Sequence, residues 1–304
     1  MAGGPALDTR PAETPKGAAP PWQVLVEAAR EELIGLGVLA ALIAVAFAPQ
    51  LAWMWSRWMA SEYYGHGVLI PPIVGYLIYR RRALLAELPK SSDRRGLVLV
   101  VAGIVLHFLG IWADVHFVSC LALIPVLLGL VQWLWGPRIA LAVLFPICYL
   151  GFMVPIDRLL IDAFSSPLQL LAAKMAGTFT QLIGIPVTRE GVNLRIPEYA
   201  FEVAIACSGI KSLTTMTALA ALYAYLTEGR LWQKAALLAS SLPIALVANA
   251  VRVTTILLVA RSLGEKAATG FLHGFSGVVV FMVGLLALYG MGWLLKCHKL
   301  RDDI

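Results

Sequence analysis

The chain has 304 residues, of which 60% are hydrophobic and only 14% are charged. Soluble domains carry roughly 25% charged residues, so this composition excludes an ordinary soluble protein, and several apolar runs reach the ~20 residues that cross a bilayer. The formal net charge of +6 does not indicate nucleic-acid binding, because the basic residues lie beside apolar runs, where they orient helices and meet anionic lipid. We expect a polytopic membrane protein.

The N-terminal region predicts a tail followed by two spans. Residues 1–30 are expected to form a disordered cytoplasmic tail, since the first 22 residues are rich in Pro, Ala and Gly and contain no signal-peptide core. The first apolar run is about Leu33–Trp55, and the second begins at His66-Gly67 and ends at Tyr79. Arg80-Arg81-Arg82 opens a short loop with six basic residues, which the positive-inside rule places in the cytoplasm.

Six further apolar runs complete an expected all-α fold of about eight transmembrane helices over residues 31–296. A basic cytoplasmic tail, residues 297–304, follows the last run. Counting crossings from the Arg-rich loop and from this tail puts residues 155 and 207 on the same, external side. The six runs are about Gly96–Trp112, Phe117–Trp135, Arg138–Pro155, Cys207–Leu226, Leu231–Ala260 and Gly270–Leu295.

Residues 156–205 are therefore expected to lie outside the membrane without crossing it. Apolar residues from Ile156 to Leu182 recur at helical spacing opposite polar ones, which predicts an amphipathic helix in the outer interface. From Val192 onward apolar and polar residues alternate, with a turn at Pro197-Glu198-Tyr199, which predicts a small β-hairpin before the next span.

The hairpin leads into Ala206-Cys207-Ser208-Gly209-Ile210-Lys211-Ser212, which starts an apolar run. A cysteine near a helix N-terminus meets the positive end of the helix dipole, which favours thiolate over thiol. Ser208 and Lys211 add a hydroxyl and a cation beside it, and Glu202 is close enough in sequence to tune it. The alternative is that Cys207 is a small buried hydrophobe that happens to start a helix.

Arg252 stands inside an apolar run, on the order of 12 Å along the helix axis from Ala260. A charge at such depth costs several kcal/mol unless it faces protein or water, which makes it a candidate functional residue. Asn249 lies on nearly the same helix face and is expected to position the guanidinium. The alternative is an arginine that reaches the outer headgroups.

His273 starts the last apolar run on the same predicted side. Alone it fits an interfacial histidine, but Cys207, Arg252 and His273 lie on three consecutive spans and toward one face. A thiolate attacks an acyl carbon, a histidine activates the thiol and protonates the leaving amine, and an arginine stabilises the oxyanion. His66, also predicted external, is a second-choice base or a substrate contact.

The four cysteines show no CxxC or metal-finger spacing, so we expect neither a disulfide framework nor a metal site. No cofactor is expected. We find no internal repeat of the kind that marks many transporters.

The motifs together resemble the exosortase/archaeosortase family, in particular the bacterial exosortases. The resemblance rests on Tyr64-Gly65-His66-Gly67 with the following Arg80-Arg81-Arg82, on the stretch from Ala206 to Ser212, on Asn249-Ala250-Val251-Arg252 and on Gly270-Phe271-Leu272-His273. It covers about residues 63–295. It implies a multi-pass inner-membrane cysteine transpeptidase or protease whose active site faces the periplasm.

The resemblance also implies substrates and roles. Partners would be exported proteins with a C-terminal sorting tail, made of a Pro-Glu-Pro-like motif, a transmembrane helix and a basic cluster. The family's nucleophile, arginine and histidine map to Cys207, Arg252 and His273, and Lys211 replaces a frequent arginine.

Two readings of other classes remain open. One is a small-solute transporter with Arg252 as an anion site, and the other is a non-catalytic scaffold for envelope polysaccharide export. Within the enzyme reading, the sequence leaves open whether water or an amine resolves the thioacyl enzyme.

Overall fold

A computed structural model describes residues 21–60, 64–156, 158–197, 199–203, 209–269 and 271–301. Within these ranges the side chains of residues 21–32, 158–160, 162–164, 199, 211, 269, 271–276, 279 and 280 are not described. The chain divides into two compact units, Met1–Pro49 and Gln50–Ile304. Each is described by itself.

The first unit consists of helix α1 (Pro21–Ala46) and the start of α2 (Ala48–Ala60). Helix α1 begins at Pro21, nine residues before the expected end of the disordered tail at residue 30. The expected first span is interrupted at Phe47, so it comprises two helices rather than one. Leu33–Ala46 and Ala48–Ala60 together meet the length and composition of one broken span.

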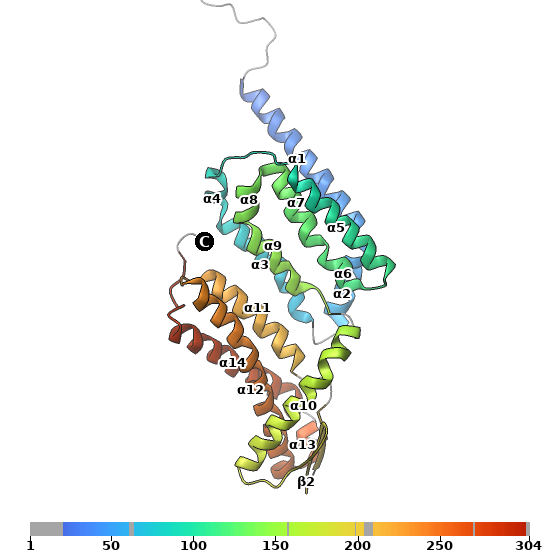
Figure 1. The fold of residues 1–304 in the computed structure, drawn as a ribbon, viewed down its shortest axis with the longest axis vertical. Coiled ribbons are helices and arrows are strands. Elements are labelled where there is room, and N and C mark those ends of the chain that lie inside the picture. The colour runs from blue at the N-terminus through green and yellow to red at the C-terminus, as the bar shows by residue number, and fades with distance from the viewer. Residues whose placement is uncertain are drawn as a thin grey trace, which may run out of the picture. The chain divides into compact units, whose positions relative to one another are not determined.

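The first half of the second unit is a group of helices that follow the predicted runs (Figure 1). Three glycines on α5, spaced seven residues apart, face the helices α6 and α7, and a Cβ atom on Gly103 would lie 2.6 Å from a methyl of Val126. Small residues at this spacing let two apolar helices approach closely without a hydrophobic driving force. The elements are η1 (Gly65–Leu69), α3 (Ile70–Arg80), α4 (Arg82–Glu87), α5 (Arg95–Trp112), α6 (His116–Leu121), α7 (Leu123–Trp135), α8 (Pro137–Ala142), α9 (Leu144–Tyr149) and η2 (Leu150–Met153).

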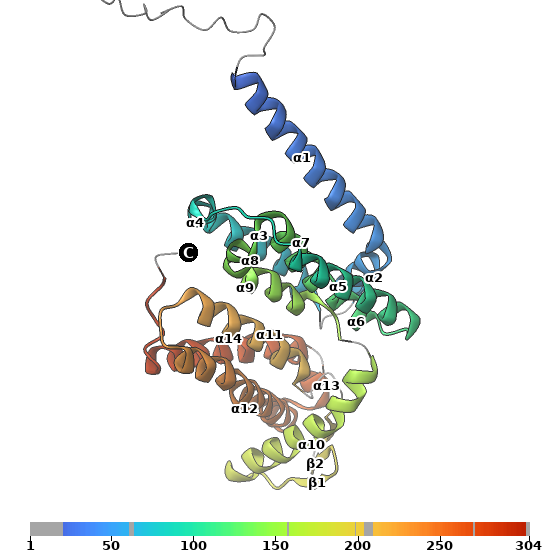
Figure 2. The ribbon, with the colours of Figure 1, turned by 45° about the horizontal axis from the view of Figure 1, so that its top comes forward.

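The second half contains five helices and a small sheet. Helix α12 is the centre of this half, since α10, α11, α13 and α14 all contact it, and Figure 2 shows α11, α12 and α14 side by side. The elements are α10 (Arg158–Leu182), β1 (Thr188–Glu190), β2 (Asn193–Ile196), β3 (Tyr199–Glu202), α11 (Ile210–Leu226), α12 (Leu231–Leu263), α13 (Glu265–Thr269) and α14 (Phe271–Leu294).

Helix α10 occupies the region expected to be amphipathic, but its buried face differs from the expected one. The buried positions are small, among them Ala172, Ala173 and Ala176. Two of the large apolar residues assigned to that face are exposed, Leu171 at 39% and Leu182 at 78%. The expected face was chosen from the helical spacing of apolar residues alone. Close packing of α10 against α12 instead places small side chains at the contact. Leu171 and Leu182 therefore remain on the outer surface of α10.

The sheet has three antiparallel strands in the order β1-β2-β3. Strands β2 and β3 pair with Leu194 opposite Phe201, in the region of the expected hairpin, and β1 adds a third strand that the alternation did not predict. One face of the sheet packs on α10, α12 and α13 in a core that includes Leu194, Phe201 and Val203. The opposite face carries the polar residues of the strands.

Three helices in the described chain are long and apolar enough to cross a membrane, or four if the bent pair counts as one span. They are α5, the combined α6–α7 and α12. Of the other expected spans, α3 has 11 residues and α11 has 17, the fifth run is divided into α8, α9 and η2, and α14 has 24 residues, of which Phe281–Leu294 counts as a shorter apolar helix. The protein is thus a helical membrane protein, and the number of eight spans stays a prediction.

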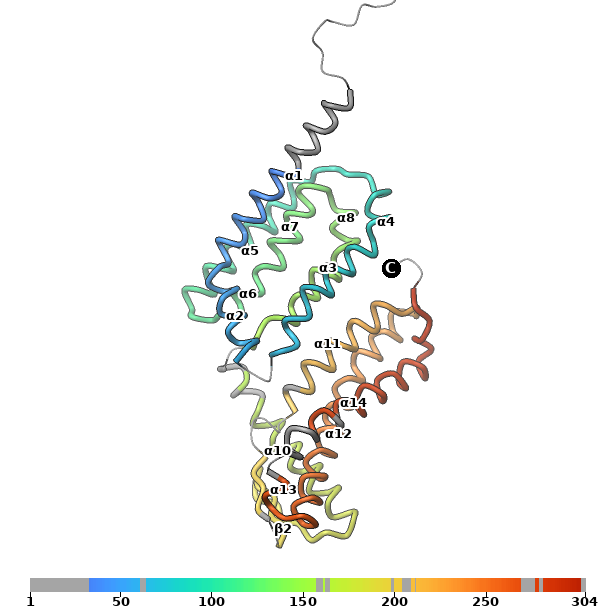
Figure 3. Tube along the Cα trace, turned by 180° about the vertical axis from the view of Figure 1, so that it is seen from behind, coloured from blue at the N-terminus to red at the C-terminus, as the bar shows by residue number. Residues whose placement is uncertain are grey.

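The Arg-rich loop after α3 and the basic C-terminal tail were expected to share the cytoplasmic side. Both lie at one end of the second unit (Figures 1 and 3). The guanidinium of Arg81, at the end of α3, lies 5.1 Å from the ring centroid of Tyr225 near the end of α11. Arg301 of the C-terminal tail lies 5.8 Å from the same ring. Its amide also donates to the carbonyl of Leu226 at 2.9 Å. The starts of α3 and α11 lie at the other end.

Candidate functional site

Helix α11 begins directly after the candidate nucleophile. Gly209 is its N-cap, with φ 90° and ψ 0°, and the carbonyl of Gly209 accepts the amide of Leu213 at 2.8 Å. Few residues other than glycine adopt this left-handed conformation without strain. Cys207 and Ser208 lie outside the described residues. Lys211 belongs to the first turn of α11, and its side chain is not described.

Gly209 and Asn249 join the start of α11 to α12. A Cβ atom on Gly209 would lie 3.3 Å from the amide nitrogen of Asn249, so the two helices approach closely here. Asn249 is buried, with 1% of its surface exposed. The expected role of Asn249 in positioning Arg252 stays a prediction, and the structure shows that Asn249 packs against Gly209 of the motif that carries Cys207.

Arg252 and Gly277 join α12 to α14. A Cβ atom on Gly277 would lie 4.0 Å from Cζ of Arg252, which is van der Waals contact. His273 is a residue of α14 and precedes Gly277 by four positions, about one helical turn. Its side chain is not described. The guanidinium of Arg252 therefore lies beside the helix that carries His273, within about one turn of that position along the chain.

The length of α12 bears on the depth of Arg252. The helix has 33 residues, roughly 50 Å at 1.5 Å per residue, which exceeds a hydrocarbon layer of ~30 Å. Beyond Arg252, residues such as Val253 and Leu257 pack on the sheet and α10. A layer that began at Leu231 would end near Arg252, whereas a layer that began later would contain it, so the depth of Arg252 in the membrane stays a prediction.

His66 lies in η1, at the start of α3, and is half-buried. Helices α3 and α11 pack together near their C-terminal ends, where Leu77 meets Tyr225. Along the helix axes it is roughly 18 Å from Leu77 back to His66 and roughly 24 Å from Tyr225 back to Gly209. Both residues thus lie at the starts of their helices, with levels that differ by roughly 6 Å. The role of His66 as a base or a substrate contact stays a prediction.

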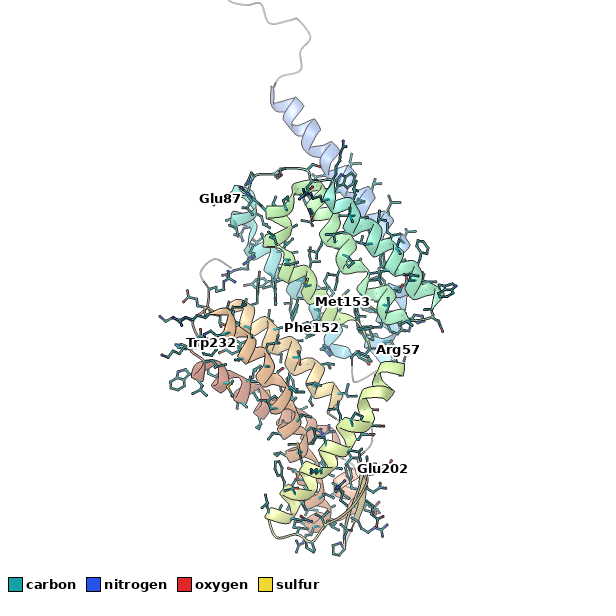
Figure 4. All side chains as sticks on the ribbon, viewed as in Figure 1. Arg57, Glu87, Phe152, Met153, Glu202 and Trp232 are labelled. Carbon is teal, nitrogen blue, oxygen red and sulfur yellow. The ribbon has the colours of Figure 1, made fainter. Side chains whose placement is uncertain are left out.

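Strand β3 is the described element that precedes the motif of Cys207 in the chain. Glu202 ends β3 and is exposed, as Figure 4 shows at the sheet. Val203, the next residue, is fully buried. A carboxylate five residues before Cys207 therefore faces solvent on the outer side of the sheet. Among the described residues, no group of three His, Cys, Asp or Glu side chains is arranged to hold a metal ion.

The structure brings together the described parts of three motifs. Gly209 meets Asn249, and Arg252 meets Gly277, so the start of α11, the middle of α12 and the first turns of α14 meet at one place. Sequence reasoning did not single out Gly277. The signal was present in the helical spacing, because residues four apart share a helix face, and His273 and Gly277 have that spacing.

Comparison with known proteins gives one match. The family model for the transmembrane exosortase (Exosortase_EpsH) matches residues 55–290. No curated protein and no solved structure matches the chain.

Proposed function

The chain belongs to the transmembrane exosortase family, a family of membrane-embedded sorting enzymes, and from this premise we propose that it cleaves the C-terminal sorting tails of exported proteins. The proposed substrate carries a Pro-Glu-Pro-like motif, a transmembrane helix and a basic cluster. The proposed enzyme is a cysteine transpeptidase or protease in the inner membrane, with its active site toward the periplasm.

The proposed reaction proceeds through a thioacyl enzyme. The Cys207 thiolate attacks the scissile carbonyl carbon, and the electron pair moves to the carbonyl oxygen, where the Arg252 guanidinium stabilises the oxyanion. The oxyanion collapses, the C–N bond breaks, and the His273 imidazolium protonates the leaving amine. Water or an acceptor amine then attacks the thioester and releases the cysteine, which gives hydrolysis or transpeptidation respectively.

One observation carries the proposal. The contacts of Gly209 with Asn249 and of Arg252 with Gly277 link the three motifs that would supply nucleophile, oxyanion donor and base. Ser208, Lys211 and His66 are proposed to contact the substrate or to support the site.

A position of Arg252 near the membrane boundary would fit a substrate that is itself a membrane protein. A peptide bond just outside a substrate's transmembrane helix lies near the same boundary. Both molecules then diffuse in one plane, and the bond meets the site without leaving the membrane surface. A low-dielectric environment at this depth strengthens the interaction between guanidinium and oxyanion.

The test uses a reporter protein with such a tail, expressed with the enzyme in bacterial cells. We expect cleavage by the wild type and none by Cys207→Ala at equal membrane abundance. Cys148→Ala is the matched control, because Cys148 is exposed on α9 and should be dispensable. Mass spectrometry of the new C-terminus distinguishes a free carboxylate from an added acceptor. Cleavage by Cys207→Ala at the wild-type rate would refute the proposal.

A further inference from the structure

Two aromatic side chains beside the turn that carries His66 have no part in the proposed mechanism. Trp58, near the end of α2, donates its indole N–H to the carbonyl of Met153 at 2.9 Å. Tyr64, the N-cap residue of η1, donates its hydroxyl to the carbonyl of Ile156 at 3.1 Å. Both acceptors lie in the stretch from the end of η2 to the start of α10. The two hydrogen bonds therefore tie the turn to a distant part of the chain.

Gly67 brings the backbone of the turn against Trp58. It follows His66 in η1 and is buried. A Cβ atom on Gly67 would overlap the indole nitrogen of Trp58, so the backbone of η1 lies directly on the indole ring. His66 is thus fixed from both sides, by Tyr64 two positions before it and by Gly67 one position after it. We call Trp58, Tyr64 and Gly67 the His66 clamp.

Two contacts show that α9 and α11 run antiparallel. Phe145 stacks on Tyr225 with ring centroids 3.9 Å apart. One turn later in α9, the hydroxyl of Tyr149 donates to the carbonyl of Ala218 at 3.3 Å. The residue number thus rises along α9 while it falls along α11. The chain that continues from α9 into η2 therefore runs toward the start of α11, which the motif of Cys207 precedes.

This register places the His66 clamp near the level of the first turn of α11. The path from Tyr149 on to Met153 covers roughly 8 Å at ~2.0 Å per residue. The path from Ala218 back to Lys211 covers roughly 10 Å at ~1.5 Å per residue. Met153, which accepts from Trp58 of the clamp, and Lys211 thus lie at nearly the same level. Lys211 also occupies the same helix face as Ala218, about two turns away, so its position lies on the side of α11 that meets α9.

We propose that Trp58 and Tyr64 are positioning residues, which hold His66 where the sorting tail passes the first turn of α11, so that the imidazole binds the backbone of the tail. This inference rests on the proposed function, in which His273 is the base, and it names the residues that place a substrate contact of the same site. A neutral imidazole has one donor and one acceptor nitrogen, which suits the N–H and C=O groups of an extended peptide. A contact that is fixed before binding avoids the free-energy cost of ordering it on binding.

The first experiment removes one donor of the clamp at a time and measures cleavage of the tail reporter by purified enzyme in mixed micelles. Tyr64→Phe and Trp58→Phe each keep an aromatic ring and lose one hydrogen bond. We expect each to raise KM roughly two- to tenfold, the effect of one hydrogen bond, and to leave kcat unchanged, because a binding contact is made equally in the ground and transition states. Tyr149→Phe is the matched control, since it also removes a tyrosine hydroxyl that donates to a carbonyl. It should lower the melting temperature about as much as Tyr64→Phe but retain the wild-type KM.

The second experiment asks whether the clamp acts through His66. His66→Ala alone should raise KM at least as much as either clamp variant. In the His66→Ala background, Tyr64→Phe and Trp58→Phe should cause no further rise, because no imidazole remains to be positioned. Additive effects, a wild-type KM in both clamp variants, or an equal rise in Tyr149→Phe would overturn the positioning role. A loss in kcat alone would overturn the substrate contact assigned to His66. A wild-type enzyme that leaves the reporter intact would refute the proposed function itself.

Discussion

The Gly209–Asn249 contact gives a quantitative prediction for a single methyl group. In Gly209→Ala the backbone of residue 209 must keep φ 90°. The new Cβ then lies 3.3 Å from Cγ and from the amide nitrogen of Asn249. A side chain in the left-handed region costs about 1–2 kcal/mol, and the close contact adds up to about 1 kcal/mol of overpacking. We expect a loss of about 1–3 kcal/mol in the free energy of unfolding.

Gly277→Ala is the matched control, because it makes the same chemical change beside the same site. Gly277 is helical, without a positive φ, and a Cβ there would lie 4.0 Å from Cζ of Arg252, an ordinary contact. Alanine is favoured over glycine in a helix by about 1 kcal/mol. We therefore expect Gly277→Ala to leave the protein as stable as the wild type or slightly more stable.

The assay is thermal unfolding of detergent-purified protein, together with the rate of reporter cleavage. Gly209→Ala should lower both, and adding Asn249→Ala should recover only the steric part of the stability loss, since the backbone strain at residue 209 remains. Gly209→Ala with wild-type stability would refute the assignment of a left-handed cap. Equal damage by the two glycine variants would refute the distinction between them.

Three further predictions concern the rest of the second unit. In Gly110→Ala the Cβ would lie 2.5 Å from the backbone of α6, so we expect a loss of about 2 kcal/mol in unfolding experiments, whereas Gly290→Ala, with open space around it, should be neutral. Tyr225→Leu removes the ring on which two arginines stack and should cost about 1–2 kcal/mol, whereas Tyr225→Phe should retain most of this stability. The Gln132 side chain and a backbone amide donate to the carboxylate of Asp93 and lower its pKa. The resulting stabilisation is present above the ordinary carboxyl pKa and is lost as pH falls through the lowered pKa. The difference in melting temperature between the wild type and Asp93→Asn should therefore shrink from pH 7 to pH 3.

The sequence predicted the helices of the second unit well, because each apolar run is long and its ends carry basic or polar residues. It did not predict the break at Phe47 or the division of the fifth run into α8, α9 and η2. Composition is almost uniform across these breaks, so hydropathy contains little information about them. Strand β1 escaped prediction for a different reason, since its three residues are all exposed and show no alternation.

For the candidate site, the sequence singled out residue types, and packing then supplied their neighbours. Cys207, Arg252 and His273 were chosen because a thiol, a cation and an imidazole coincide on three consecutive spans, although each alone has a bland explanation. The close approach of the helices that follow or carry them involves two glycines: Gly209 belongs to a motif that the sequence singled out, whereas Gly277 gave no signal of its own. Gly209 and Gly277 mark where α12 approaches its two neighbours, and only the folded chain reveals which helix each glycine faces.

The same helix explains why site and sheet belong together. One part of α12 carries Asn249 and Arg252 at the level of Gly209, and the next turns pack Val253 and Leu257 against the sheet. A displacement of α12 along its axis would therefore shift the guanidinium and the strand edge together. Rigid packing of this kind transmits a change at one part to the other. The sheet and a carbonyl held beside Arg252 would thus share one rigid support.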